Sequence, residues 1–143
     1  MQPRIFVPFD FSPAAESALR WAADLRRSLG GGTIRVVHVV SVMPIAGTVE
    51  MPPLPTPSEE ETRQLERSLR EITDRLAPGS SAQVVLGLTV GPTLITEAEQ
   101  CAAELIVMGT HGRGGLKRLI LGSVADHIIR HASCPVVTMR DPG

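Results

Sequence analysis

The sequence has 143 residues, which predicts a single domain over residues 1–143, because domains usually hold about 100–150 residues. With 43% hydrophobic and 20% charged residues, the composition excludes an intrinsically disordered or collagen-like chain. The 14 basic and 15 acidic residues leave a net charge of −1, so no overall field attracts nucleic acid or an anionic membrane.

The first half of the chain alternates strand and helix patterns. An apolar run at 5–7, closed by Pro8, predicts a strand. Ser12 as N-cap and Pro13 as first helical residue open a helix whose apolar stripe continues to Leu29, before the glycines at 30–32. The run 33–40 is apolar through much of its length, which is typical of a central strand covered on both faces.

The second half continues the alternation. Residues 41–57 are rich in proline and predict a long loop. Ser58 and Glu61 have the spacing of a capping box, which opens a helix that ends before Pro78-Gly79. The later elements are expected as a strand at 84–90, a helix at 93–103, a strand at 105–108, a helix at 122–131 and a strand at 135–139. This order predicts an α/β fold with a parallel sheet.

Several kinds of partner are not indicated. No apolar run approaches the roughly 20 residues of a membrane-spanning helix, and the first residues lack a signal-peptide pattern. The two cysteines, Cys101 and Cys134, favour reduced thiols in a cytoplasmic protein. Because there are few aromatic residues, nucleic-acid bases have little to stack on. We therefore expect a cytoplasmic protein that binds neither membranes nor nucleic acid.

The strongest chemical signal is the glycine-rich stretch from Gly109 to Val124. Its glycines let backbone approach a ligand closely, and Gly122-Ser123 opens a helix whose free N–H groups favour an anion. Arg113, with two further basic residues, adds positive charge. In an open parallel sheet this stretch follows the carboxyl end of a strand, where ligands bind. A phosphate-binding loop is one interpretation, and a glycine turn with a solvated basic face is an equal alternative.

The stretch differs from two common phosphate motifs. It lacks the lysine of GxxxxGK[ST], and the GxGxxG fingerprint is absent after the first strand. Its spacing, Gly109-x2-Gly112-x9-Gly122-Ser123, instead resembles the G-x2-G-x9-G-(S/T) motif of the universal stress protein family. The flanking runs at 105–113 and 122–137, and those at 5–12 and 37–40, also resemble that family.

This resemblance implies a fold and a ligand. The fold would be a three-layer α/β sandwich with a five-stranded parallel sheet in the order 3-2-1-4-5, as in Rossmann-like proteins. The motif is that of the ATP-binding branch, which implies ATP as cofactor and leaves Mg²⁺ on its phosphates open. The residues implied at the nucleotide are Pro8, Phe9, Asp10, Val39, Met108, Gly109, His111, Gly112, Arg113, Gly122, Ser123 and Val124.

Within that set the resemblance implies different roles. Asp10 would lie by the ribose and adenine and Val39 in the adenine pocket, while Gly122 and Ser123 would hold phosphates. Phe9 departs from the small or aliphatic residue usual at its position, which predicts a narrower adenine pocket. The resemblance also implies a homodimer formed through the last strand, Pro135 to Met139; an unpaired apolar edge strand favours pairing with another chain.

Three functions remain open at this point. The first is an ATP-binding stress-response or signalling module with slow or no hydrolysis and no catalytic residues. The second is an enzyme, an ATPase or an adenylyl transferase, for which Asp10 or His111 would have to act. The third is an interaction protein that binds no nucleotide.

Other histidines and cysteines favour structural interpretations. His127 and His131 have the i,i+4 spacing of a zinc helix but lack the adjoining glutamate and a third ligand. His38 lies within an apolar strand and is expected to be a hydrogen-bonded core residue, and Cys134 to be a packing residue.

Overall fold

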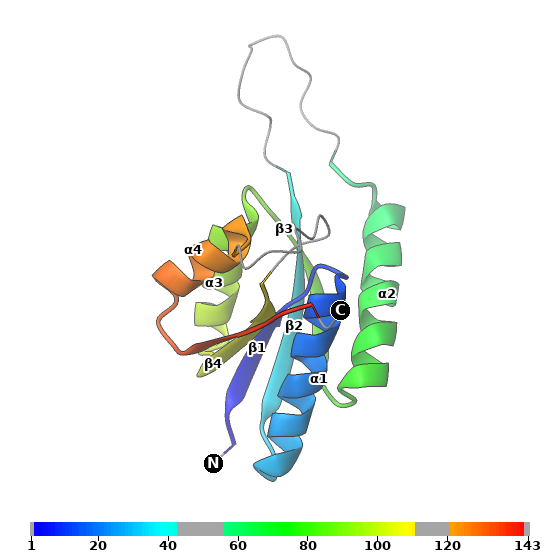
Figure 1. The fold of residues 1–143 in the computed structure, drawn as a ribbon. Coiled ribbons are helices and arrows are strands. Elements are labelled where there is room, and N and C mark those ends of the chain that lie inside the picture. Colours follow the sequence, from blue (N-terminus) through cyan, green and yellow to red (C-terminus); the bar gives the residue numbers. More distant parts are fainter. Residues whose placement is uncertain (1, 43–55, 111–120, 142–143) are drawn as a thin grey trace.

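The computed structural model describes residues 2–42, 56–110 and 121–141 (Figure 1). The strands are β1 (Arg4–Pro8), β2 (Thr33–Ser41), β3 (Ser81–Gly87), β4 (Leu105–Gly109) and β5 (Val136–Met139). The helices are α1 (Pro13–Ser28), α2 (Glu59–Leu76), α3 (Val90–Gln100) and α4 (Ser123–His131). Among these helices, none is long and apolar enough to cross a membrane. Most of the predicted loop 41–57 lies outside the described residues.

The five strands form one parallel sheet in the order β3-β2-β1-β4-β5, which confirms the predicted fold class. β1 lies at the centre and pairs with β2 on one side and with β4 on the other. The chain therefore adds β2 and β3 on one side of β1, and then β4 and β5 on the other side. The order of the strands thus reverses between β1 and β4, at their carboxyl ends.

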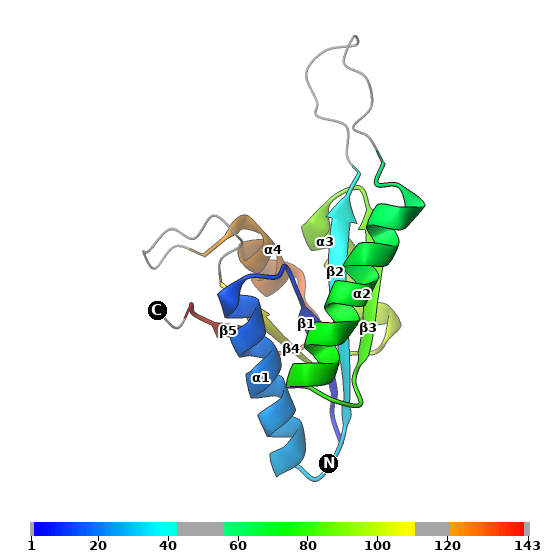
Figure 2. The ribbon, with the colours of Figure 1, turned by 90° about the vertical axis from the view of Figure 1, so that its right-hand side faces the viewer.

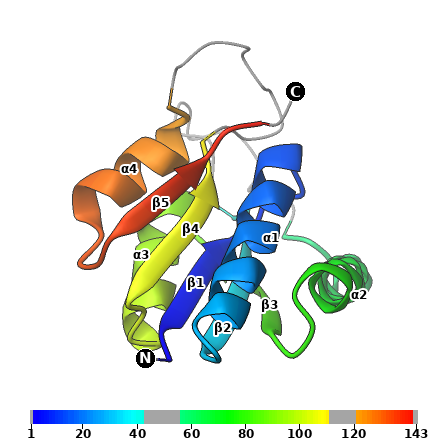
Figure 3. The same ribbon diagram turned by 60° about the horizontal axis from the view of Figure 1, so that its bottom comes forward.

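Helices cover both faces of the sheet (Figure 2). α1 and α2 lie on one face, over a buried cluster that includes Val7, Val36 and Leu69. α3 and α4 lie on the other, over a cluster that includes Phe6 and Ile128. Figure 3 shows the two helix layers with the sheet between them. Because successive side chains of a strand point to opposite faces, a strand covered on both sides is mostly apolar, as the run 33–40 indicated for β2.

The two helix caps that the sequence predicted, at Ser12 and Ser58, are confirmed. Ser12 Oγ accepts a hydrogen bond from Ala15 N at 3.1 Å and so caps α1. At α2, Ser58 Oγ accepts from Glu61 N at 3.1 Å, while Ser58 N donates to the Glu61 carboxylate at 2.7 Å. These bonds satisfy N–H groups that have no partner within the helix, and they fix where each helix begins.

The predicted bounds of β3 and α3 were each three residues too far along the sequence. The structure places β3 at Ser81–Gly87 rather than 84–90, because β3 pairs along β2 from Ser81 onward despite its polar start. It places α3 at Val90–Gln100 rather than 93–103. Pro92 is tolerated in the first turn, where its missing N–H would have no partner within the helix. At the other end, Ala102 takes a positive φ of 51°, so that the helix stops without the glycine that usually marks such an end.

Candidate functional site

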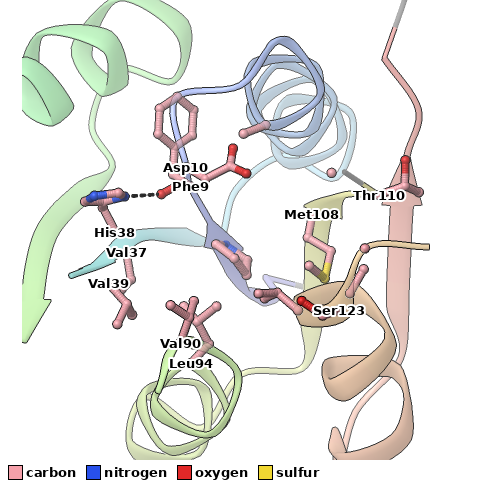
Figure 4. Close-up of a pocket in the computed structure, with 16 residues that line it drawn as sticks. Phe9, Asp10, Val37, His38, Val39, Val90, Leu94, Met108, Thr110 and Ser123 are labelled. Atoms are coloured by element: carbon pink, nitrogen blue, oxygen red, sulfur yellow. Dashed lines mark hydrogen bonds between the residues drawn. The ribbon is translucent and has the colours of Figure 1, made fainter. Parts of the chain in front are cut away.

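A cavity of about 330 Å³ lies at the carboxyl ends of β1, β2 and β4, where the order of the strands reverses. Open parallel sheets bind ligands at this position, because the crossover helices diverge there to opposite faces and leave space between them. The first turns of α3 and α4 and residues 8–10 complete the lining (Figure 4).

The cavity brings together most of the residues that sequence comparison implied at a nucleotide. Its lining includes Pro8, Phe9, Asp10, Val39, Met108, Gly109, Gly122, Ser123 and Val124. The other three, His111, Gly112 and Arg113, lie outside the described residues. That the nine lining residues contact a nucleotide stays a prediction, whereas their position around one cavity is a property of the structure.

The turn between β1 and α1 presents a carboxylate at the cavity. Asp10 is half-buried, and its Oδ1 accepts a hydrogen bond from Ser12 N at 3.0 Å. Its other oxygen, Oδ2, has no hydrogen-bond partner among the described residues. One oxygen therefore holds the turn, and the other remains able to accept a hydrogen bond from a ligand hydroxyl.

The N-terminus of α4 forms the opposite wall. Gly122, its N-cap, donates its N–H to the Thr110 carbonyl at 2.7 Å, and no side chain of the described residues caps the helix. The next three N–H groups, at 123–125, have no intrahelical acceptor because the helix begins there, and all three residues line the cavity. A helix N-terminus carries about half a positive charge, so this wall favours an anion.

The middle of the cavity is apolar. Val37 and Val39 come from β2, Met108 from β4 and Leu94 from α3, and each is buried. Sequence reasoning identified Val39 and Met108 but missed Val37, Val90 and Leu94. Val90 was expected to end the strand 84–90, whereas the structure places it in the first turn of α3. The other lining residues that it missed are Ala15, His38, Thr110 and Ala125.

His38 is hydrogen-bonded, as the sequence predicted, and it also borders the cavity. Its Nδ1 is hydrogen-bonded to the Phe9 carbonyl at 2.7 Å, as expected for a histidine in an apolar strand, but it also lines the cavity. Within the described lining, Asp10 and His38 are the ionisable side chains. Figure 4 shows them apart from Ser123, which lies across the cavity.

Phe9 borders the cavity, yet its ring belongs to the buried cluster under α1 and α2. Phe9 as a whole is 3% exposed, and its ring meets Phe11 edge-on, with 5.3 Å between ring centroids. The extra bulk at this position is thus accommodated in the core of the protein.

A shallower depression of about 340 Å³ adjoins the cavity and shares Val90, Ser123 and Val124 with it. His127 lies on its rim, and the His127 and His131 rings stack with centroids 4.2 Å apart. The described residues contain no group of three or more potential metal ligands.

The cysteines lie elsewhere, at the far ends of α3 and α4. Burial, with a smaller contribution from Cys101, raises the pKa of the Cys134 thiol. A raised pKa keeps this thiol protonated, which agrees with a packing role.

The fold and the cavity define a class: doubly wound α/β proteins in which a glycine-rich segment leads into a helix N-terminus at the point of strand reversal. The chain belongs to the universal stress protein family, whose model matches residues 1–140. It is 28% identical over 142 residues to a universal stress protein of Methanocaldococcus jannaschii, an alignment that covers 97% of this chain and 82% of the relative. It is also 31% identical over 137 residues to universal stress protein A homolog 1 of Coxiella burnetii, with 94% of each chain covered.

Solved structures share the fold. The universal stress protein UspA from Lactobacillus plantarum superimposes with a TM-score of 0.75 at 22% identity, covering 96% of this chain and 97% of its own. A universal stress protein from Archaeoglobus fulgidus in complex with dAMP gives a TM-score of 0.65 at 23% identity, with 97% and 98% covered. A universal stress protein in complex with cAMP gives 0.70 at 18% identity, with 98% of each chain covered. Some proteins of this fold and family thus bind nucleotides.

Gly109 tests how tightly the wall of the cavity is packed. A Cβ at this position would lie 2.8 Å from Ala14 Cβ, which is closer than carbon atoms approach. We expect Gly109→Ala to lower the free energy of unfolding by about 1–3 kcal/mol, the usual cost of overpacking, as measured by urea denaturation.

The double variant Gly109→Ala/Ala14→Gly is the matched control. It removes the methyl group that the new Cβ would meet, so it should recover part of the loss in spite of the helix penalty for glycine. A single Gly109→Ala variant as stable as the parent protein would contradict this account of the packing.

Proposed function

We propose that this protein binds ATP and acts as a nucleotide-dependent module in a stress response or in signalling, located in the cytoplasm. The proposal rests mainly on one observation: residues 123–125, whose N–H groups have no acceptor within α4, line a cavity that is otherwise largely apolar. Such a site offers apolar surface to a base at one place and hydrogen-bond donors to phosphate at another.

The arrangement of the lining suggests how the nucleotide lies. Val37, Val39 and Leu94 would contact adenine, and Asp10 Oδ2 would accept a hydrogen bond from a ribose hydroxyl. The phosphates would extend toward Gly122 and the Ser123 hydroxyl. Family resemblance adds His111, Gly112 and Arg113 to the phosphate side.

Mg²⁺ would arrive with the nucleotide. It requires near-octahedral oxygen ligands, whereas the described lining offers a single carboxylate, that of Asp10. Most of its oxygens would therefore come from phosphates and water. The dAMP and cAMP complexes of related proteins support an adenine nucleotide, and the length of the phosphate chain is the part of the proposal that needs measurement.

Replacing Gly122 tests the phosphate side. Its φ of −63° and ψ of 159° are accessible to any residue, so Gly122→Val puts a side chain beside the first N–H groups of α4 without straining the backbone. We expect this variant to lose at least 10-fold in ATP affinity by calorimetry, about 1.4 kcal/mol of binding free energy, with little change in stability.

Ser133→Val is a suitable control, because this exposed residue lies beyond the opposite end of α4. It should bind ATP as the parent protein does. Full ATP affinity in Gly122→Val would remove the proposed role of the α4 N-terminus, and a parent protein that binds no adenine nucleotide would remove the proposed function.

We further propose that ATP is held with slow or no hydrolysis. General base catalysis needs a base within hydrogen-bonding reach of the attacking water, but the ionisable side chains of the described lining, Asp10 and His38, lie across the cavity from Ser123 (Figure 4). With Mg-ATP, we expect fewer than about one phosphate released per chain in an hour, far below typical enzyme turnover. Many turnovers that Asp10→Ala abolishes would instead indicate an ATPase.

We also propose a homodimer through β5, the edge strand next to β4. The carbonyls of Pro135 and Met139 accept hydrogen bonds from the β4 side, so the backbone groups of Val136 and Thr138 point outward. An exposed edge of this kind pairs readily with a second chain.

Light scattering at micromolar concentration should then give twice the mass of one chain. Thr138→Pro removes an outward N–H but leaves the pairing with β4, so it should give monomers, whereas Thr138→Val should remain dimeric. A monomeric parent protein would rule out this dimer.

A further inference from the structure

The peptide groups of Phe9, the residue before Asp10, are held on both sides by β2. Phe9 N donates to the Val37 carbonyl at 2.8 Å, which extends the β1–β2 pairing by one residue. The Phe9 carbonyl in turn accepts from His38 Nδ1 at 2.7 Å. A carbonyl oxygen only accepts, so His38 must carry a proton on Nδ1. Consecutive residues of β2 thus fix the peptide groups on either side of Phe9.

The next residue makes this turn strained. Phe11 has a φ of 63°, a conformation that is costly for any residue except glycine and occurs where surrounding contacts impose it. The Phe11 ring packs edge-on against Phe9 and against the His38 imidazole, the latter with 4.9 Å between centroids. His38 therefore contacts the turn twice, once through a hydrogen bond and once through its ring.

Asp10 lies between these two fixed points. Its backbone follows the Phe9 carbonyl and precedes the strained Phe11, and its Oδ1 is tied to Ser12 N. We propose that His38 is a positioning residue: by holding the Phe9 carbonyl, it fixes the Asp10 carboxylate in the direction in which Oδ2 meets the ribose hydroxyls of the nucleotide. This inference rests on the proposed function, which it deepens by assigning sugar selectivity to one hydrogen bond.

The choice of histidine supports the inference. An aliphatic residue would suit an apolar strand equally well for packing, but it would leave the Phe9 carbonyl without the partner that it now has. Phe9 is 3% exposed, so a carbonyl that lost this bond would be costly to leave unsatisfied, and the turn would rearrange to find water. Protonation of His38 leaves Nδ1–H in place, so this hydrogen bond does not require the neutral ring.

Three substitutions separate the hydrogen bond from the packing. In His38→Asn the amide nitrogen occupies nearly the place of Nδ1 and keeps the donor. In His38→Gln the donor moves one bond farther along the side chain, and His38→Leu has none. Urea denaturation of each variant measures stability independently of ligand binding.

The binding readout compares ATP with 2′,3′-dideoxy-ATP, which lacks both ribose hydroxyls. We expect His38→Leu to bind ATP about 3–10-fold more weakly, as for the loss of one hydrogen bond, and dideoxy-ATP almost unchanged. His38→Asn should keep the parent ratio of the two affinities, and His38→Gln should lie between. Equal weakening of both nucleotides, or no effect in His38→Leu, would overturn the proposal.

A double-mutant cycle with Asp10→Asn tests whether the two residues act together. If His38 acts through Asp10, then His38→Leu adds little to the loss already caused by Asp10→Asn. Additive losses would show that His38 acts on the ligand by another route and would contradict the positioning role.

A readout without nucleotide keeps this inference separate from the proposed function. The Ser12 N–H, which donates to Asp10 Oδ1, should exchange with solvent several-fold faster in His38→Leu than in the parent protein or His38→Asn, as measured by NMR. If the parent protein binds no adenine nucleotide, the proposed function fails together with the ribose part of this inference. Unchanged Ser12 exchange in His38→Leu, in a protein that does bind ATP, overturns the positioning role alone.

Discussion

The constraint on which the site depends is the central position of β1, which pairs with β2 on one side and β4 on the other. Right-handed crossovers then send α1 to one face of the sheet and α3 and α4 to the other. The carboxyl ends of β1 and β4 are left with helices departing in opposite directions, and the space between them is the cavity. No residue of the lining creates this space; the topology does, and the lining determines what it accepts.

The kind of ligand that fits the cavity follows from the different chemistry of its two sides. The β2 and α3 side is aliphatic, with Val37, Val39 and Leu94 buried against one another. The α4 side carries backbone donors, and the hydrogen bond from Gly122 N to the Thr110 carbonyl joins the chain segments that flank 111–120. Because these donors belong to the backbone, the site needs no lysine of the GxxxxGK[ST] kind, and a nearly neutral chain is compatible with an anionic ligand.

Sequence patterns predicted those structural features that depend on neighbouring residues in the chain, such as helix caps. The caps at Ser12 and Ser58 were found because a hydroxyl that serves a free N–H group has a fixed place in the sequence. The start of α3 was expected three residues late, at Thr93, whereas the helix includes Pro92 in its first turn, where proline is tolerated. Its end was missed because Ala102 adopts the conformation expected of glycine. The strand order came from family resemblance, since pairing between distant segments leaves no local signal. His38 was predicted as a hydrogen-bonded residue, but its partner, a backbone carbonyl on another strand, has no signature in the sequence.

The glycine that ends β4 and the glycine that precedes α4 have different physical explanations. Gly109 is required by the protein itself, since the start of α1 occupies the space that a side chain would need. Gly122 adopts a backbone conformation open to every residue, and an N-cap usually favours serine, threonine, asparagine or aspartate, whose side chains would satisfy the N–H groups behind it. Glycine has no side chain that could provide this stabilisation. The phosphates of the proposed nucleotide would supply acceptors for these N–H groups, so the proposed function would account for glycine at this position.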